Sequence, residues 1–250
     1  MSRIVVIGGT GLIGSKVIQR LATHGHDAVA ASPRLGVNTL TGEGLAEVLA
    51  GANTVLDVSN SPSFADDDVM NFFTMSTTNI VEAAKAASLT HYVAVSVVGS
   101  DRMVDSGYQR AKVAQERILK ASGIPYSLVH ATQFFEFVTG IAGAGTVGDE
   151  VHLSHALIRP LAADDVATAV AQVTVGEPLN GTIEIAGPEE FGIDDFVRRG
   201  LAALADHRTI VTDPEATYFG QRLTDRMLLP GPDATIFDTR FEDWIAASAR

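Results

Sequence analysis

The sequence contains no cysteine among its 250 residues. This absence excludes disulfide bonds, thiolate metal sites and a cysteine nucleophile, and it is compatible with a reducing cytoplasm, where we expect the protein to reside. Long apolar runs are also missing, because glycines interrupt the apolar N-terminal stretch and no run approaches the roughly 18 residues that a membrane-spanning helix needs. We therefore expect a protein that does not cross a membrane.

Basic residues are scarce. Lys and Arg number 18 against 30 Asp and Glu, which gives a formal net charge of −12. Nucleic acid and anionic membranes both require clustered Lys and Arg for sequence-independent binding, so neither is an expected partner. Hydrophobic residues make up 46% of the chain, enough for one large core at this length. We expect one domain over residues 1–250 whose partner is a small-molecule substrate.

Short β-branched runs alternate with segments of helical periodicity, as in βαβ units. The expected strands are 3–7, 28–31, 54–58, 91–98, 126–130 and 182–186, and the expected helices are 15–24, 44–49, 69–87, 108–121 and 164–175. Residues 140–151, rich in glycine and alanine, are expected to form a mobile loop. The pattern predicts an α/β fold with a doubly wound, mostly parallel sheet, helices on both faces, and a small C-terminal substrate-binding portion at about 188–250.

A glycine-rich segment, IVVIGGTGLIGS, places Gly8, Gly11 and Gly14 directly after an apolar strand and at the start of a helix. A Rossmann-type dinucleotide site has this arrangement, because the glycines permit a tight turn, a close approach to the pyrophosphate and close helix packing. The helix N-terminus adds a partial positive charge. Other residues expected to line the turn are Thr10, Leu12 and Ile13. The alternative is a glycine-rich loop without a ligand.

The end of the second expected strand favours NADPH over NADH. An NAD-selective site places a carboxylate about 20 residues beyond the glycines, where it holds the ribose 2′-hydroxyl. In this chain the segment is AASPRLG, in which Ser32 and Arg34 supply a hydroxyl and a guanidinium suited to the 2′-phosphate of NADP(H). The alternative is that Arg34 is an ordinary solvated charge.

Tyr108 and Lys112 lie four residues apart at the start of an expected helix, so their side chains share one face. An ammonium beside a tyrosine favours the phenolate and would lower the tyrosine pKa from its usual value near 10 toward a range useful for proton transfer. Ser96 ends a buried strand and is expected to donate to a substrate carbonyl, with Ser100 as a competitor for that role. The alternatives are a surface Tyr–Lys pair and a buried structural serine.

Taken together, the glycine pattern, VSVVGSD, the Tyr-x-x-x-Lys pair and LAADDVATAV resemble the atypical short-chain dehydrogenases/reductases, specifically the NmrA-like NAD(P)H-binding group, over roughly residues 1–200. The resemblance implies that Ser96, Tyr108 and Lys112 form a catalytic triad, with Lys112 also binding the nicotinamide ribose and Asn79 supporting it. His130 stands where relatives often have arginine. Further cofactor contacts implied by the resemblance are Val58, Ser59, Asn60, Ala131, Thr132 and Phe134.

Other sites are less well supported by the sequence. Neither the His24/His26 nor the His152/His155 spacing matches a zinc motif, so no metal is expected, and the absence of Gly-x-Ser-x-Gly disfavours a serine hydrolase. Several aromatic residues are expected either to cover an apolar substrate pocket or to belong to the core. These residues are Phe134, Phe135, Phe137, Tyr218, Phe219 and Trp244.

The sequence thus predicts an NADPH-dependent reductase that transfers hydride to a small ketone or aldehyde, with Tyr108 as proton donor. Many relatives that resemble NmrA lack this tyrosine and act as redox sensors, so a non-catalytic NADP(H)-sensing regulator is one alternative. An NADPH-dependent quinone reductase, which need not use Tyr108, is another. The long helices at 69–87 and 108–121 are compatible with a homodimer interface, and equally with packing on their own sheet.

Overall fold

The computed structural model describes residues 2–248. Its central sheet has seven parallel strands in the order β14-β9-β5-β4-β3-β1-β2. The strands are β1 (Arg3–Ile7), β2 (Asp27–Ala31), β3 (Thr54–Asp57), β4 (His91–Val97), β5 (Tyr126–Ala131), β9 (Gly181–Ala186) and β14 (Thr235–Ile236). The doubly wound α/β class predicted from the sequence is confirmed.

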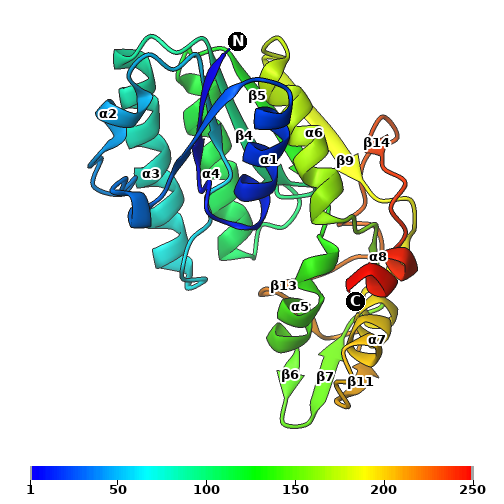
Figure 1. Cartoon of the computed structure of the whole chain (residues 1–250). Coiled ribbons are helices and arrows are strands. Elements are labelled where there is room, and N and C mark those ends of the chain that lie inside the picture. The colour runs from blue at the N-terminus through cyan, green and yellow to red at the C-terminus, as the bar shows by residue number, and fades with distance from the viewer. Residues whose placement is uncertain (1, 249–250) are drawn as a thin grey trace.

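Helices cover both faces of the sheet because successive strand residues point to opposite sides. In β1, Ile4 and Val6 face one hydrophobic cluster, whereas Val5 and Ile7 face another. The first cluster packs under α1 (Leu12–Thr23) and α6 (Ala163–Val175), and the second under α2 (Leu45–Leu49), α3 (Asp66–Ala86) and α4 (Gly107–Ala121). Figure 1 shows α1 and α6 on one side of the sheet and α2 and α3 on the other.

A smaller lobe lies beyond the carboxyl ends of the sheet strands (Figure 1). It has its own buried cluster, centred on Phe135, Phe196 and Phe241. Its elements are α5 (Val138–Ala144), β6 (Thr146–Val147), β7 (Glu150–Leu153), β8 (Leu157–Ile158), β10 (Phe191–Gly192), α7 (Ile193–Ala203), β11 (Thr209–Thr212), β12 (Thr217–Tyr218), β13 (Gln221–Arg222) and α8 (Phe241–Ser248).

The small lobe corrects one expectation. Residues 140–151 are not a mobile loop, because they contribute to α5, β6 and β7. Val138, Ile141 and Ala142 have helical spacing, and Val151 and Leu153 alternate toward the same buried cluster, a pattern that the high glycine content obscured. The chain from about 134 to 158 also belongs to this lobe, through α5, β6, β7 and β8, so the lobe is larger than the portion expected at 188–250; the substrate-binding role of that portion stays a prediction.

None of the helices in residues 2–248 is both long enough and apolar enough to span a bilayer. The parallel sheet instead defines where a ligand can bind. Because all seven strands run the same way, the segments that follow them emerge at one edge, beside the small lobe, and ligands of open α/β sheets bind at this carboxyl edge. The residues predicted to bind cofactor and substrate follow β1, β2, β3 and β5 or begin α4, so the fold brings these segments to that edge.

Candidate functional site

The turn between β1 and α1 is closed by glycines that leave no room for a side chain. Gly8 has φ +79°, and a Cβ there would lie 2.9 Å from the backbone nitrogen of Ser59. A Cβ at Gly14 would lie 2.4 Å from the carbonyl oxygen of Gly8. The helix begins at Leu12 with Gly11 as N-cap, and no side chain caps it. The first N–H groups of α1 therefore lie where an anion can reach them.

The exposed residues of this turn are Thr10, Gly11 and Leu12, and the Leu12 side chain is 41% exposed. An apolar side chain left open at a helix N-terminus fits the contact expected with a dinucleotide. Ile13 differs from the expectation, because its side chain is buried in the cluster beneath α1. Helical geometry turns the Ile13 side chain toward the sheet, so only its backbone faces the predicted cofactor position.

Ser32 and Arg34 follow β2 in a short 3₁₀ turn, Pro33–Leu35. The Ser32 hydroxyl is buried and has no hydrogen-bond partner among the residues described, whereas Arg34 is exposed and has no ion pair there. A buried hydroxyl without a partner is unfavourable unless a ligand or water satisfies it. These two residues therefore fit a group that brings hydrogen-bond acceptors and negative charge, as the adenosine end of NADPH does.

The loop after β3 lies directly against the glycine turn. The backbone N–H of Val58 donates to Ile7 (3.0 Å), and Gly8 approaches both Val58 and Ser59 too closely for a Cβ. The Ser59 hydroxyl donates to Asp57 at 2.6 Å, while Asn60 is exposed. This loop therefore forms one wall of the predicted dinucleotide site, held in place by Asp57.

Ala131 ends β5 and Thr132 follows it. Both side chains are buried, and the Thr132 hydroxyl donates to the carbonyl oxygen of Arg159 at 2.6 Å. Phe134 is half-buried and its ring stacks on the exposed Phe137, with centroids 5.1 Å apart. Phe134 and Phe137 therefore form the accessible surface of this segment, next to the small lobe.

Tyr108 and Lys112 lie in the first two turns of α4, as the sequence predicts, and both contact Phe73 of α3. The Tyr108 ring meets the Phe73 ring edge-on at 5.8 Å, and Lys112 Nζ lies 4.3 Å from the centre of that ring. Burial raises the pKa of Tyr108 to about 12. This is opposite in direction to the lowering expected from Lys112, because burial of the phenol disfavours the phenolate.

Lys112 is buried and points inward. Its ammonium donates to the carbonyl oxygen of Val95 at 2.9 Å and to the side chain of Gln115. Gln115 donates in turn to Asp57 at 3.0 Å, and Asp57 also accepts from Tyr92. Burial lowers the pKa of Lys112 to about 8, although the charges of Asp57 and Glu116 oppose this shift.

Gln115 and Asp57 were not predicted as site residues, yet they link Lys112 to the cofactor loop through Ser59. Asn79, the residue expected to support Lys112, donates instead to the backbone carbonyls of Thr39 (2.8 Å) and Leu40 (3.0 Å). It therefore holds the loop before α2. The position of Asp57 at the end of an apolar strand was a signal available in the sequence, whereas nothing in the sequence distinguishes Gln115.

Ser96 does not join Tyr108 and Lys112 in one hydrogen-bonded set. Its buried hydroxyl donates to Glu116 at 2.6 Å, and His130 Nε2 on the neighbouring strand lies 2.8 Å from the same carboxylate oxygen. Ser100 is also engaged, donating to Val97 and to Gln109 at 2.8 Å each. The Ser96 side chain shares the α4 face of β4 with Tyr92 and Ala94. This position does not favour a role as donor to a substrate, and that role stays a prediction.

Glu116 is expected to stabilise the fold in a pH-dependent way. Burial alone would raise its pKa, but the close and positively charged His130, together with hydrogen bonds from Ser96 and Lys120, lowers the pKa to about 2. The stabilisation is complete above the ordinary glutamate pKa of 4.5 and is lost as pH falls from about 5 toward 2. A shift of this size corresponds to about 3 kcal/mol as an upper limit.

Denaturant unfolding of wild type and Glu116→Gln at several pH values tests this. The wild type should be more stable by a few kcal/mol at pH 7, and the difference should shrink as pH approaches 3. Glu82→Gln, at an exposed position on α3, serves as control and should change little at either pH. A difference between wild type and Glu116→Gln that does not vary with pH would contradict the assignment.

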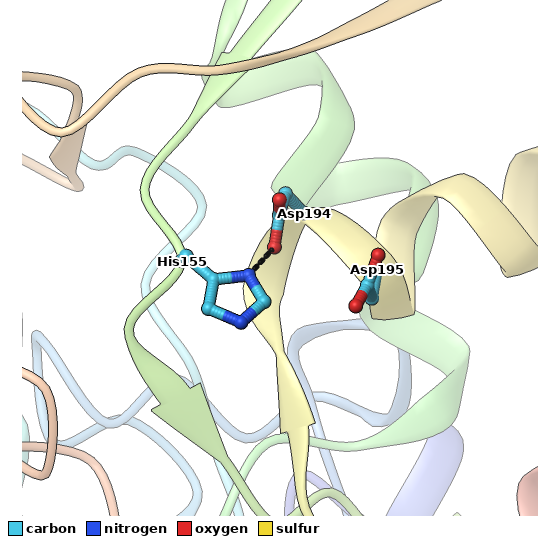
Figure 2. A group of neighbouring side chains, drawn as sticks. All are labelled: His155, Asp194 and Asp195. Carbon is cyan, nitrogen blue, oxygen red and sulfur yellow. Dashed lines mark hydrogen bonds and ion pairs between the residues drawn. The ribbon is translucent and has the colours of Figure 1, made fainter.

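In residues 2–248, a group of potential metal ligands lies in the small lobe: His155, Asp194 and Asp195. Figure 2 shows the His155 ring pointing at Asp194, while Asp195 lies to the side; His155 Nδ1 is 2.7 Å from Asp194 Oδ1. The second oxygen of Asp194 accepts from Thr212 at 2.5 Å, and Asp195 pairs with Arg198. All three side chains already have protein partners, so nothing here points to a metal, and its absence stays a prediction.

Two surface hollows accompany the small lobe. One, of about 500 Å³, lies between α7 and β11, away from the carboxyl edge. The other, of about 290 Å³, includes Arg159, Arg226 and Leu229. Arg159 binds Gly187, just after β9, and accepts from Thr132, just after β5. The second hollow therefore adjoins the carboxyl edge where the predicted site lies.

The fold and the glycine turn together define a dinucleotide-binding protein of the Rossmann class. Residues 8–175 match the model of the NAD(P)H-binding family. The chain belongs to this family, as the resemblance predicted, and NAD(P)H is its cofactor class.

Curated relatives are distant. The chain is 24% identical over 151 residues to the photosystem II assembly factor Ycf39 of Cyanophora paradoxa, covering 55% of this chain and 47% of that protein. It is 26% identical over 223 residues to the chloroplastic divinyl chlorophyllide a 8-vinyl-reductase of Cucumis sativus, covering 75% and 53%. The chain thus spans about half the length of these relatives.

Solved structures share the fold over most of the chain. A dTDP-4-dehydrorhamnose reductase from Clostridium acetobutylicum superposes with a TM-score of 0.73 at 17% identity, covering 99% of this chain and 98% of that one. A dTDP-4-dehydrorhamnose reductase from Bacillus anthracis, in complex with NADP, gives a TM-score of 0.68 at 12% identity, covering 90% and 89%. At these identities the likeness extends to the fold alone.

Proposed function

We propose that the protein is an NADPH-dependent reductase of small carbonyl compounds, with Tyr108 as the proton donor. The observation that carries the proposal is the position of Tyr108 at the carboxyl edge, one helical turn from the buried ammonium of Lys112. The cofactor would be held by the glycine turn, Ser32 and Arg34. NADPH, when bound, supplies a hydride to the carbonyl carbon.

The raised pKa of Tyr108 suits reduction. A phenol whose pKa is about 12 remains protonated throughout the physiological range, so it can donate a hydrogen bond to the carbonyl and then its proton to the oxygen. The carbonyl carbon gains the hydride, the oxygen gains the proton, and an alcohol and NADP⁺ result. Oxidation in the reverse direction requires a phenolate, which burial disfavours.

Lys112 would support Tyr108 electrostatically. Hydrogen bonds from Lys112 to Gln115 and from Gln115 to Asp57 fix the ammonium against Phe73, the ring that Tyr108 also contacts. Loss of the phenolic proton would leave a negative charge that this ammonium stabilises. The role of Ser96 as a donor to substrate is not part of the proposal, since Glu116 occupies its hydroxyl.

A second function, a non-catalytic NADP(H)-sensing regulator, is favoured by one observation. Ser96 and Lys112, two of the three residues predicted to act on a substrate, both donate to other protein groups rather than pointing at a free ligand position. The relative named as an assembly factor is compatible with such a role. A cytoplasmic location and a homodimer remain predictions under either function.

Oxidation of NADPH, followed by the loss of its absorbance, separates these functions. We expect the wild-type protein to turn over at least one member of a panel of aldehydes, ketones and quinones. If NADPH binds by calorimetry but no acceptor in the panel is reduced, the regulator is the better assignment. The calorimetric measurement keeps a failure to bind cofactor distinct from a failure to react.

Arg34 is expected to select NADPH over NADH, because its exposed guanidinium has no ion pair in the described chain and suits a phosphate. Arg34→Ala should weaken NADPH binding about tenfold or more and leave NADH binding within about twofold, given the strength of charge-assisted hydrogen bonds. Arg117→Ala, at an exposed position on α4, is the control. If Arg34→Ala weakens the binding of NADPH and NADH equally, Arg34 has no role in cofactor selectivity.

A further inference from the structure

Aromatic rings from three distant segments meet around Tyr108. Phe64, from the loop before α3, lies 5.6 Å from the Tyr108 ring, and Phe219, from the turn between β12 and β13, lies 6.3 Å from Phe64. Tyr218 packs edge-on against Phe219 at 4.8 Å. Burial raises the pKa of Tyr218; a hydrogen bond with Gln133 lowers it and the charge of Tyr108 raises it further.

The outer rings of this group are open to solvent. Phe64 is 56% exposed and Phe219 is 38% exposed, whereas Phe73 on the inner side of Tyr108 is fully buried. Phe64 and Phe219 therefore contribute less to the core than their size allows, and their free surfaces lie beside the proposed proton donor.

Phe219 is also held in a costly backbone conformation. Its φ is +46°, and Gly220 follows with φ +84°, as in the tight hairpin turns that normally carry Asn-Gly. A left-handed conformation is unfavourable for an aromatic residue. The buried side chain of Gln221 accepts a hydrogen bond from the backbone N–H of Asp105 at 2.9 Å. This bond fixes the hairpin and therefore the position of the Phe219 ring.

We propose that Phe64 and Phe219 form a clamp that selects flat, conjugated carbonyl substrates over saturated ones. The inference rests on the proposed function, because it places the ring of the substrate beside Tyr108. The two rings are tilted by 32° with centroids 6.3 Å apart, whereas a planar ring stacked between two parallel rings needs about 7 Å. Admission of an aromatic ring therefore requires the Phe219 hairpin to move outward and the two rings to align face to face.

Phe219→Gly tests the clamp, since glycine fits the positive φ and removes the ring without backbone strain. Two aldehydes serve as probes: 2-naphthaldehyde, which is flat, and cyclohexanecarbaldehyde, which is puckered. We expect kcat/KM for 2-naphthaldehyde to fall about tenfold, mainly through KM, and that for cyclohexanecarbaldehyde to change less than twofold. Leu204→Ala, exposed in the small lobe, is the control and should leave both unchanged.

If Phe219→Gly lowers kcat/KM equally for the two aldehydes, the clamp is overturned, whereas the proposed reductase function is not. If the wild type reduces neither aldehyde, binding of 2-naphthol and cyclohexanol in the presence of NADPH is compared by calorimetry. Tighter binding of 2-naphthol that Phe219→Gly abolishes supports the clamp even though the proposed reaction has failed. Equal affinity for the two alcohols overturns the clamp.

Discussion

Tyr108→Phe is expected to lower kcat/KM for carbonyl reduction by about 10²- to 10⁴-fold, the usual contribution of a positioned proton donor. The phenyl ring retains the packing against Phe64 and Phe73, so the fold and NADPH affinity should be unchanged. Steady-state NADPH oxidation measures the rate, and calorimetry with NADPH verifies binding. The loss should appear mainly in kcat, because the proton is transferred in the transition state.

Tyr126→Phe is the matched control. Tyr126 is also half-buried, but it starts β5 at the amino edge of the sheet, far from the glycine turn. Removal of the Tyr126 hydroxyl should leave NADPH turnover within about twofold of wild type. If Tyr108→Phe retains full turnover, Tyr108 is not the proton donor, and an acceptor such as a quinone, whose reduction need not use this tyrosine, becomes the better substrate class.

The fold was predictable because its signals are local. Apolar strands ending in a glycine turn, followed by helices of clear periodicity, predict parallel βαβ units whatever the rest of the chain does. The same holds for the Gly8 to Gly14 turn, which depends on residues close in sequence. The small lobe was less predictable, because α5 and β7 acquire stability from a cluster that residues 191–241 complete.

The site was only partly predictable, because its side chains form hydrogen bonds with residues that are distant in the sequence. Tyr108 and Lys112 share a helix face, which spacing alone predicts. The partners of Lys112, by contrast, come from β4 and α4, and Gln115 extends this set to Asp57 at the end of β3. Ser96 binds Glu116, twenty residues later. A resemblance to a family transfers a residue to a position, but burial and hydrogen bonding decide which way its side chain points.

Gly14→Ala is expected to damage both the fold and the cofactor site, because no atom can be added at Gly14 without moving backbone. The added Cβ would lie 2.4 Å from the Gly8 carbonyl oxygen and 2.7 Å from Gly9 Cα, and neither group is a flexible side chain. We expect a loss of about 1–3 kcal/mol in unfolding free energy, as for other overpacked sites, and NADPH binding weakened more than tenfold. Denaturant unfolding and calorimetric titration measure the two effects.

Gly140→Ala separates crowding at the turn from a general effect of replacing a helical glycine. Gly140 lies inside α5, and a Cβ there meets no atom within 4 Å. Since alanine is the better helix former, this variant should be unchanged or more stable by up to about 1 kcal/mol, with normal NADPH affinity. If Gly14→Ala binds NADPH as tightly as Gly140→Ala does, the β1–α1 turn is not where the pyrophosphate is held, and the cofactor site must be placed elsewhere on the carboxyl edge.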